Sequence, residues 1–155
     1  MSYPPLHELV PHEPPMLLLE RVCDFTEDSV TCEGEITDGC PFVENGCVEA
    51  LVTLELMAQT IAVFVGLEQR RRGAAGEQPR VGYLVGAQNV VFRVPSLSVG
   101  EQVLTEARLQ WHEGPLARFA CRVSDGTRAL AEGVLTAYQS PAQPGAAHDE
   151  PGARA

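Results

Sequence analysis

The chain has 155 residues, which suits a single domain with a sizeable buried core. It carries 21 acidic and 11 basic residues, for a net charge of -10. This balance argues against nucleic acids and anionic membranes as partners, because both bind clustered positive charge. The one dense basic cluster, Arg70 to Arg72, directly follows an apolar run. Such a cluster either complements the carbonyl end of a helix or docks a phosphate or an acidic protein.

The first third of the chain predicts a short helical turn, two strands and a loop. The turn is expected over 6–10, and the prolines that follow it impose an extended path. Apolar and alternating patterns predict strands over 16–25 and 29–36. Glycine, proline and asparagine predict a loop over 38–46.

One long helix is predicted over 49–71. In helical projection its run ALVTLELMAQTIAVFVGL, from Ala50 to Leu67, is apolar on nearly all sides, unlike an amphipathic surface helix. Glu55, Gln59 and two threonines argue against a membrane span, so we expect a buried core helix. One concave sheet cannot cover such a helix alone, and a second subunit is expected to help cover it.

Four further strands are predicted over 81–94, 102–112, 117–124 and 129–138, with turn residues between them. The segment after them is rich in proline, glycine and alanine, so we expect a mobile tail over 140–155. The order of the elements predicts an α+β domain over 1–139, with an antiparallel sheet wrapped around the central helix.

The five cysteines indicate a cytoplasmic protein with reduced thiols. Their number is odd, they are not closely paired, and no signal peptide precedes them. Their spacing does not match a zinc site, so no bound metal is expected. These residues are Cys23, Cys32, Cys40, Cys47 and Cys121.

Glu55 is the one charged side chain within the apolar run. A buried carboxylate is usually paired, exposed at an edge or held with a raised pKa, and a raised pKa suits a general acid. In projection Glu55 lies at the border of the apolar arc, beside Ala62 and Gly66. The run alone is compatible with two roles for Glu55. The carboxylate either points outward or pairs with an Arg, or it acts as a functional acid.

Four segments carry a resemblance to a known family: LVPHEPPMLLLERVCDF from Leu9, LELMAQTIA from Leu54, VVFRVPSLSVGEQVLTEARL from Val90 and RALAEGVLTA from Arg128. These segments resemble segments of the FabZ-type 3-hydroxyacyl-acyl-carrier-protein dehydratases and follow the same order along the chain. Those dehydratases have the hotdog fold. The chain is most similar to the branch associated with aryl polyene biosynthesis, which shares PH.PPMLLL, LELMAQT and a turn like LVGAQ from Leu84.

The resemblance implies a dimeric hotdog protein that removes water from a 3-hydroxyacyl thioester and leaves the trans-2-enoyl thioester. The acyl group is carried on the phosphopantetheine of an acyl carrier protein, and no separate cofactor is implied. In the family a His takes the proton beside the carbonyl, and a helix carboxyl, which aligns with Glu55, helps the hydroxyl to leave. Backbone N–H groups near the helix start polarise the carbonyl.

The chain departs from the family at the His. The family has a His-Phe-Pro-Gly motif about fourteen residues before the carboxylate, where this chain reads CPFVE from Cys40. The base has therefore moved, the chemistry differs, or activity is lost. We predict His12 as the substitute base, with a structural turn histidine as the alternative. Cys40 is a weaker candidate base, and Glu44 and Glu49 are alternative acids.

Further roles follow from the resemblance. We expect substrate contacts from Phe42, Cys47, Val48 and Gln59, and docking of the acidic carrier protein by Arg93, Arg70, Arg71 and Arg72. The expected assembly is a homodimer or higher oligomer, or a dimer with a related hotdog subunit. Two other functions are open: a thioesterase in which Glu55 activates water, and a non-catalytic subunit that completes an active dehydratase.

Overall fold

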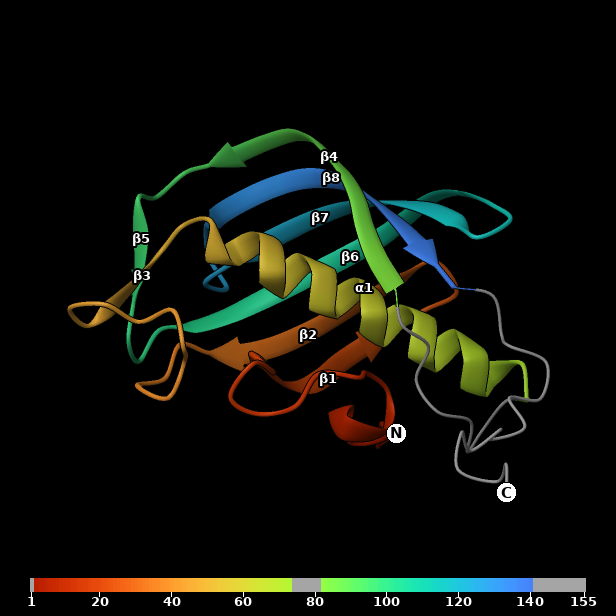
Figure 1. Ribbon diagram of the computed structural model, residues 1–155, viewed down its shortest axis with the longest axis horizontal. Coiled ribbons are helices and arrows are strands. Elements are labelled where there is room, and N and C mark those ends of the chain that lie inside the picture. The colour runs from red at the N-terminus through yellow and green to blue at the C-terminus, as the bar shows by residue number, and fades with distance from the viewer. Residues whose placement is uncertain (1, 74–81, 141–155) are drawn as a thin grey trace, which may run out of the picture.

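The computed structural model describes residues 2–73 and 82–140. Six antiparallel strands form one sheet, in the order β1-β2-β6-β7-β8-β4 (Figure 1). Their bounds are Leu19–Phe25 (β1), Ser29–Glu35 (β2), Gln102–Glu113 (β6), Leu116–Ser124 (β7), Ala129–Gln139 (β8) and Gly82–Phe92 (β4). A 3-10 turn η1 spans Leu6–Glu8, the helix α1 spans Val52–Arg71, and the short strands β3 (Cys47–Glu49) and β5 (Ser96–Ser98) pair with each other.

The sheet curves around α1, which lies across its concave face (Figure 1). The face of α1 toward the sheet buries Leu56, Met57 and Val63 completely. The ring of Phe64 makes edge contacts with Phe25 and Phe119, at centroid distances of 5.7 and 5.4 Å. The α+β hotdog arrangement predicted from the sequence is confirmed.

The opposite face of α1 is only half covered within one chain. Leu51 is 59% exposed, and Ala58, Ala62 and Val65 are partly exposed. This face looks toward β4, an end strand whose Tyr83 is 57% exposed. The helix is therefore apolar on both sides, as predicted, but this chain buries one side alone.

The largest differences between the predicted and the observed elements lie at three places. The first strand begins at Leu19 instead of residue 16, because Met16 and Leu17 donate backbone hydrogen bonds to Glu13 in a turn. The helix begins at Val52 because residues 47–49 form β3. The strands β3 and β5 were not predicted, because three-residue strands show no periodicity. Val81 and the predicted tail beyond Ser140 lie outside the described residues.

No helix in the described ranges is long and apolar enough to cross a membrane.

Candidate active site

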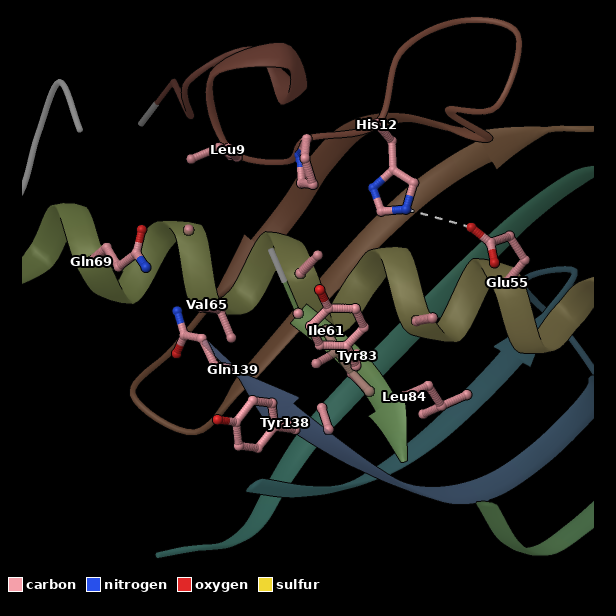
Figure 2. Close-up of a pocket in the computed structure, with 16 residues that line it drawn as sticks. Leu9, His12, Glu55, Ile61, Val65, Gln69, Tyr83, Leu84, Tyr138 and Gln139 are labelled. Carbon is pink, nitrogen blue, oxygen red and sulfur yellow. Dashed lines mark ion pairs between the residues drawn. The ribbon is translucent and has the colours of Figure 1, made fainter. Parts of the chain in front are cut away.

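A close backbone approach places the segment containing His12 over α1. At Gly66 a Cβ atom would lie 2.5 Å from the carbonyl oxygen of Leu9 and 3.1 Å from its Cα. Since any side chain there would collide with the backbone, glycine permits the N-terminal segment to rest directly on the helix. His12 follows three residues after Leu9 and lies farther along the helix, toward its N-terminus (Figure 2).

His12 and Glu55 face each other across the pocket shown in Figure 2. The His12 Nε2 lies 3.6 Å from the Glu55 Oε1, and the two side chains are 29% and 34% exposed. This distance suits an ion pair when the imidazole is protonated, and a small rearrangement would bring the atoms within hydrogen-bond reach. The two residues predicted as catalytic are therefore neighbours in one chain.

Gln59 binds Glu55 and the chain segment that follows His12. Its Nε2 donates to the Glu55 Oε1 at 2.8 Å and to the backbone oxygen of Met16 at 2.7 Å. Its Oε1 accepts from the Leu18 N–H at 2.9 Å. One fully buried amide thus orients the carboxylate and anchors the chain that follows His12.

The second imidazole nitrogen has no partner within the described part of the chain. The His12 Nδ1 is buried, and no hydrogen bond satisfies it there. Such an atom is costly unless another group meets it. It therefore marks a position at which a bound molecule or a second subunit can supply a donor or an acceptor.

The pocket is a groove of about 230 Å³ along the half-exposed face of α1 (Figure 2). The helix contributes small or apolar side chains between its two ends, and the residues 82–84 and 137–139 form the opposite wall. Glu55 closes the end near the helix start, and Gln69 lies at the other end. The helix residues between them are Ala58, Ile61, Ala62, Val65 and Gly66.

A second hollow lies at the start of α1 and shares Glu55 with the groove. Its lining includes Phe42, Cys47, Leu51 and Val52. No side chain caps the helix, and the N–H groups of Thr53 and Leu54 donate to the backbone oxygens of Ala50 and Leu51. The carboxylate of Glu55 thus lies between an apolar groove and a helix N-terminus that can polarise a carbonyl group.

The other residues predicted to bind substrate divide into two groups. Phe42, which is 43% exposed, and Cys47 line the hollow at the helix start. Val48 is 1% exposed and its side chain belongs to the core. The amide of Gln59 is fully buried behind Glu55, with protein partners for both polar atoms.

The loop that carries the His in the family supplies no base here. Cys40 is 7% exposed and belongs to the hydrophobic core. Burial also raises the pKa of the Cys32 and Cys121 thiols to about 12, which keeps them protonated. Glu44 and Glu49 line the hollow at the helix start but do not touch the groove.

The arginines predicted to dock a carrier protein are all paired with carboxylates of this chain. Arg93 contacts Glu132 at 2.6 Å, and Arg70 contacts Glu8 at 2.5 Å. Arg71 and Arg72 contact Glu68 at 2.8 and 3.6 Å. Hydrogen bonding to Glu68 raises the pKa of Arg71 above its ordinary value, so the guanidinium stays charged.

The sequence predictions missed the residues that shape the groove. Ala58, Ala62 and Gly66 recur at a spacing of four, which places small side chains in one line on a helix. That pattern could have indicated the groove. The sequence did not indicate Gln69 and Gln139, because they are 70 residues apart in sequence and only the fold brings them to one groove. Within residues 2–73 and 82–140, no three His, Cys, Asp or Glu side chains cluster to hold a metal ion.

The chain is similar to known dehydratases over most of its length. The chain is 27% identical over 140 residues to the 3-hydroxyacyl-[acyl-carrier-protein] dehydratase FabZ of Polynucleobacter asymbioticus, covering 86% of this chain and 89% of that protein. It is 26% identical over 137 residues to the FabZ of Streptococcus thermophilus, covering 84% and 92% of the two chains.

A solved structure described as the dehydratase heterocomplex ApeI:P from Xenorhabdus doucetiae is similar in fold. The identity is 29% and the TM-score 0.83, over 91% of this chain and 94% of that one. The family described as ApeP-like, ApeP dehydratase, matches residues 4–148, which is nearly the whole chain. The chain therefore belongs to the ApeP-like dehydratase family.

Proposed function

We propose that this protein removes water from a 3-hydroxyacyl thioester carried by an acyl carrier protein and yields the trans-2-enoyl thioester. The observation that carries the proposal is the His12 and Glu55 pair, 3.6 Å apart, at the junction of an apolar groove and a helix N-terminus. Membership of a dehydratase family and similarity to FabZ proteins support it.

The groove along α1 and the hollow at the helix start hold different parts of the substrate, and the two parts meet at the reacting carbons. The acyl chain lies in the groove along α1, because its walls are mostly apolar and it begins at Glu55. The thioester and the pantetheine arm lie in the hollow at the helix start, where the positive end of the helix dipole stabilises the negative charge that develops on the carbonyl oxygen during proton removal.

The reaction is a proton transfer at each of two neighbouring carbons. His12 takes the proton from C2, the electrons of that C–H bond form the C2–C3 double bond, and the C3–O bond breaks. Glu55 gives its proton to the leaving hydroxyl, which departs as water. Imidazolium and carboxylate then stand 3.6 Å apart, so the proton can pass from His12 to Glu55 and restore the starting state.

A second subunit completes the molecule in this proposal. The strand β4 is an uncharged end strand of eleven residues, and Tyr83, Leu84, Val85, Val91 and Phe92 on it are each more than 40% exposed. Long apolar edges of this kind are normally paired, because they otherwise template aggregation. Pairing along β4 also covers the half-exposed face of α1 that carries Glu55.

The alternative is a subunit that completes an active dehydratase without performing the chemistry itself. The similar solved structure is described as a heterocomplex, and the loop of the family His motif has no His in this chain. The paired arginines also offer little uncompensated positive charge for an acidic carrier protein.

Mass spectrometry of the carrier-bound product separates these functions. The purified protein is incubated with a 3-hydroxyacyl-carrier protein, alone and together with a hotdog subunit that retains the family His motif. We expect loss of one water from the carrier-bound acyl group with this protein alone. Release of free acid would indicate a thioesterase, and turnover that requires the second subunit would support the non-catalytic alternative.

A further inference from the structure

The turn that precedes β3 carries asparagine followed by glycine at its tip. Asn45 and Gly46 both have left-handed backbone conformations, with φ of 54° and 77°. The Glu44 N–H donates to the Cys47 oxygen at 2.9 Å, and the Cys47 N–H donates to the Glu44 oxygen at 3.2 Å, which closes a two-residue turn. Asparagine and glycine are favoured in such a turn because both tolerate positive φ.

The atoms that can react with each other in this turn are exposed and without hydrogen-bond partners among the described residues. Both Asn45 and Gly46 are exposed, and neither the Asn45 amide nor the Gly46 N–H makes a hydrogen bond there. Gly46 is held through its carbonyl oxygen, which accepts from the Val99 N–H at 2.9 Å. A Cβ atom at Gly46 would meet nothing within 4 Å. The Asn45 side chain can therefore approach the Gly46 nitrogen without losing a bond.

We propose that Asn45 is a site of spontaneous covalent modification, at which the asparagine converts to isoaspartate and alters the hollow at the start of α1. The Gly46 nitrogen loses its proton to water or hydroxide and attacks the Asn45 Cγ. The side-chain nitrogen leaves as ammonia, and a five-membered imide joins the two residues. Water then opens the imide. Attack at Cγ gives aspartate, whereas attack at the backbone carbonyl gives isoaspartate, in which the chain runs through the side-chain carbon.

The sequence offers an internal comparison, because its only other asparagine is Asn89. Asn89 is also exposed and also has a positive φ, of 52°. The residue after it is Val90, whose branched side chain is stiff and shields the backbone nitrogen that has to attack. Glycine places no side chain there. Since exposure and φ are alike at the two sites, a difference in their conversion reports the effect of Gly46.

Conversion changes the hollow at the start of α1 in charge and in shape. Asn45 lines this hollow together with Glu44, Glu49 and Glu55, so the product adds a fourth carboxylate to the lining. Isoaspartate also adds one carbon to the backbone of a turn that leads directly into the pairing of β3 with β5. On the basis of the function proposed above, the hollow binds the phosphopantetheine arm. The added negative charge therefore weakens binding of that anionic arm.

Peptide mapping by mass spectrometry tests the conversion itself. The full-length protein is kept at mildly alkaline pH, and samples are digested over time. Replacement of the amide by a carboxyl group adds about 1 Da to the peptide, and a protein isoaspartyl methyltransferase labels the isoaspartate. We expect conversion at Asn45 to be at least about tenfold faster than at Asn89. Gly46→Ala should slow it, and Asn45→Gln should abolish the label, because glutamine would have to form a less favoured six-membered imide.

Isothermal titration calorimetry with a saturated acyl-phosphopantetheine amide tests the effect on the hollow. Aged wild type should bind the amide at least about fivefold less tightly than fresh wild type, whereas aged and fresh Asn45→Gln should bind it equally. Circular dichroism verifies that each aged sample is folded.

Equal conversion of the two asparagines, an unmodified Asn45, or conversion without loss of affinity would overturn this inference. The mass measurement is independent of the dehydration assay and of ligand binding. A fresh protein that fails to bind the amide would therefore contradict the proposed function, while the conversion at Asn45 is still decided by mass.

Discussion

Gln59 connects Glu55 with the chain segment that follows His12. Its amide binds Glu55 directly and binds the chain segment from Met16 to Leu18 that follows His12. Glu55 lies one helical turn before Gln59, whereas 41 and 43 residues separate Gln59 from Leu18 and Met16. Gln59 therefore acts as a positioning residue in this account.

Replacement of Gln59 should reduce both stability and turnover. In Gln59→Leu the buried N–H of Leu18 loses its acceptor, and a buried polar group without a partner costs about 1–3 kcal/mol. Chemical denaturation measures this loss of unfolding free energy. At a temperature where the variant is folded, kcat should also fall, because Glu55 is no longer held. Gln110→Leu is the exposed control, and equal kcat in Gln59→Leu and wild type would argue against the positioning role.

At the level of elements, the packing of the N-terminal segment on α1 decides whether His12 reaches Glu55. The contact depends on Gly66, where a Cβ atom would lie 2.5 Å from the Leu9 oxygen. A glycine in a helix interior normally costs about 1 kcal/mol relative to alanine. Its presence within α1 is explained by the close approach of the backbone.

The variant Gly66→Ala should therefore lose activity in spite of its better helix propensity. The added methyl group pushes the N-terminal segment away from α1, which moves His12 from Glu55 and lowers kcat/KM. Gly39→Ala is a matched control, because its Cβ would meet no atom closer than 3.7 Å. If Gly66→Ala showed wild-type kcat/KM and higher stability, the helix propensity would dominate and the proposed positioning would be wrong.

The hairpin between β7 and β8 gives a pH-dependent contribution to stability. Asp125 accepts hydrogen bonds from the N–H groups of Arg128 and Thr127 and from the Thr127 hydroxyl, which holds its pKa well below the usual range. A depressed pKa means that the ionised form stabilises the fold at neutral pH. This contribution is lost as the pH falls from about 4 through the lowered pKa.

Denaturation of wild type and Asp125→Ala at several pH values tests this. The variant should be less stable at pH 7, and the difference should shrink as the pH falls below about 4. Asp38→Ala, at an exposed loop position, is the control and should show little difference at either pH. A difference that is constant with pH would show that the Asp125 carboxylate does not contribute in this way.

At the scale of the whole molecule, one chain leaves a continuous apolar region open along β4 and the adjoining face of α1. We expect a second subunit to cover this region. Val85→Arg places a charge on β4, where Val85 is 57% exposed, and should shift the mass measured by light scattering from dimer toward monomer. Gln110→Arg adds the same charge on β6 and should leave the mass unchanged. An identical dimer in both variants would place the interface elsewhere.

The sequence predicted the central helix and the long strands well, because their hydrophobic patterns extend over many residues. It also indicated Glu55, since a carboxylate inside an apolar run is conspicuous. The sequence did not predict the contacts between segments that are distant along the chain. The pairing of Arg93 with Glu132 spans 39 residues, and the burial of Val48 depends on the pairing of β3 with β5. Such contacts depend on the tertiary fold, which leaves no local pattern.

The most direct test of the account is the rate of water loss from a 3-hydroxyacyl-carrier protein for wild type and Glu55→Gln, followed by mass spectrometry. Glutamine keeps the size of the side chain but cannot donate a carboxyl proton, so kcat should fall by about 100-fold or more. Glu20→Gln, on the exposed face of β1, should retain the wild-type rate. A Glu55→Gln variant that is folded and removes water at the wild-type rate would contradict the central claim.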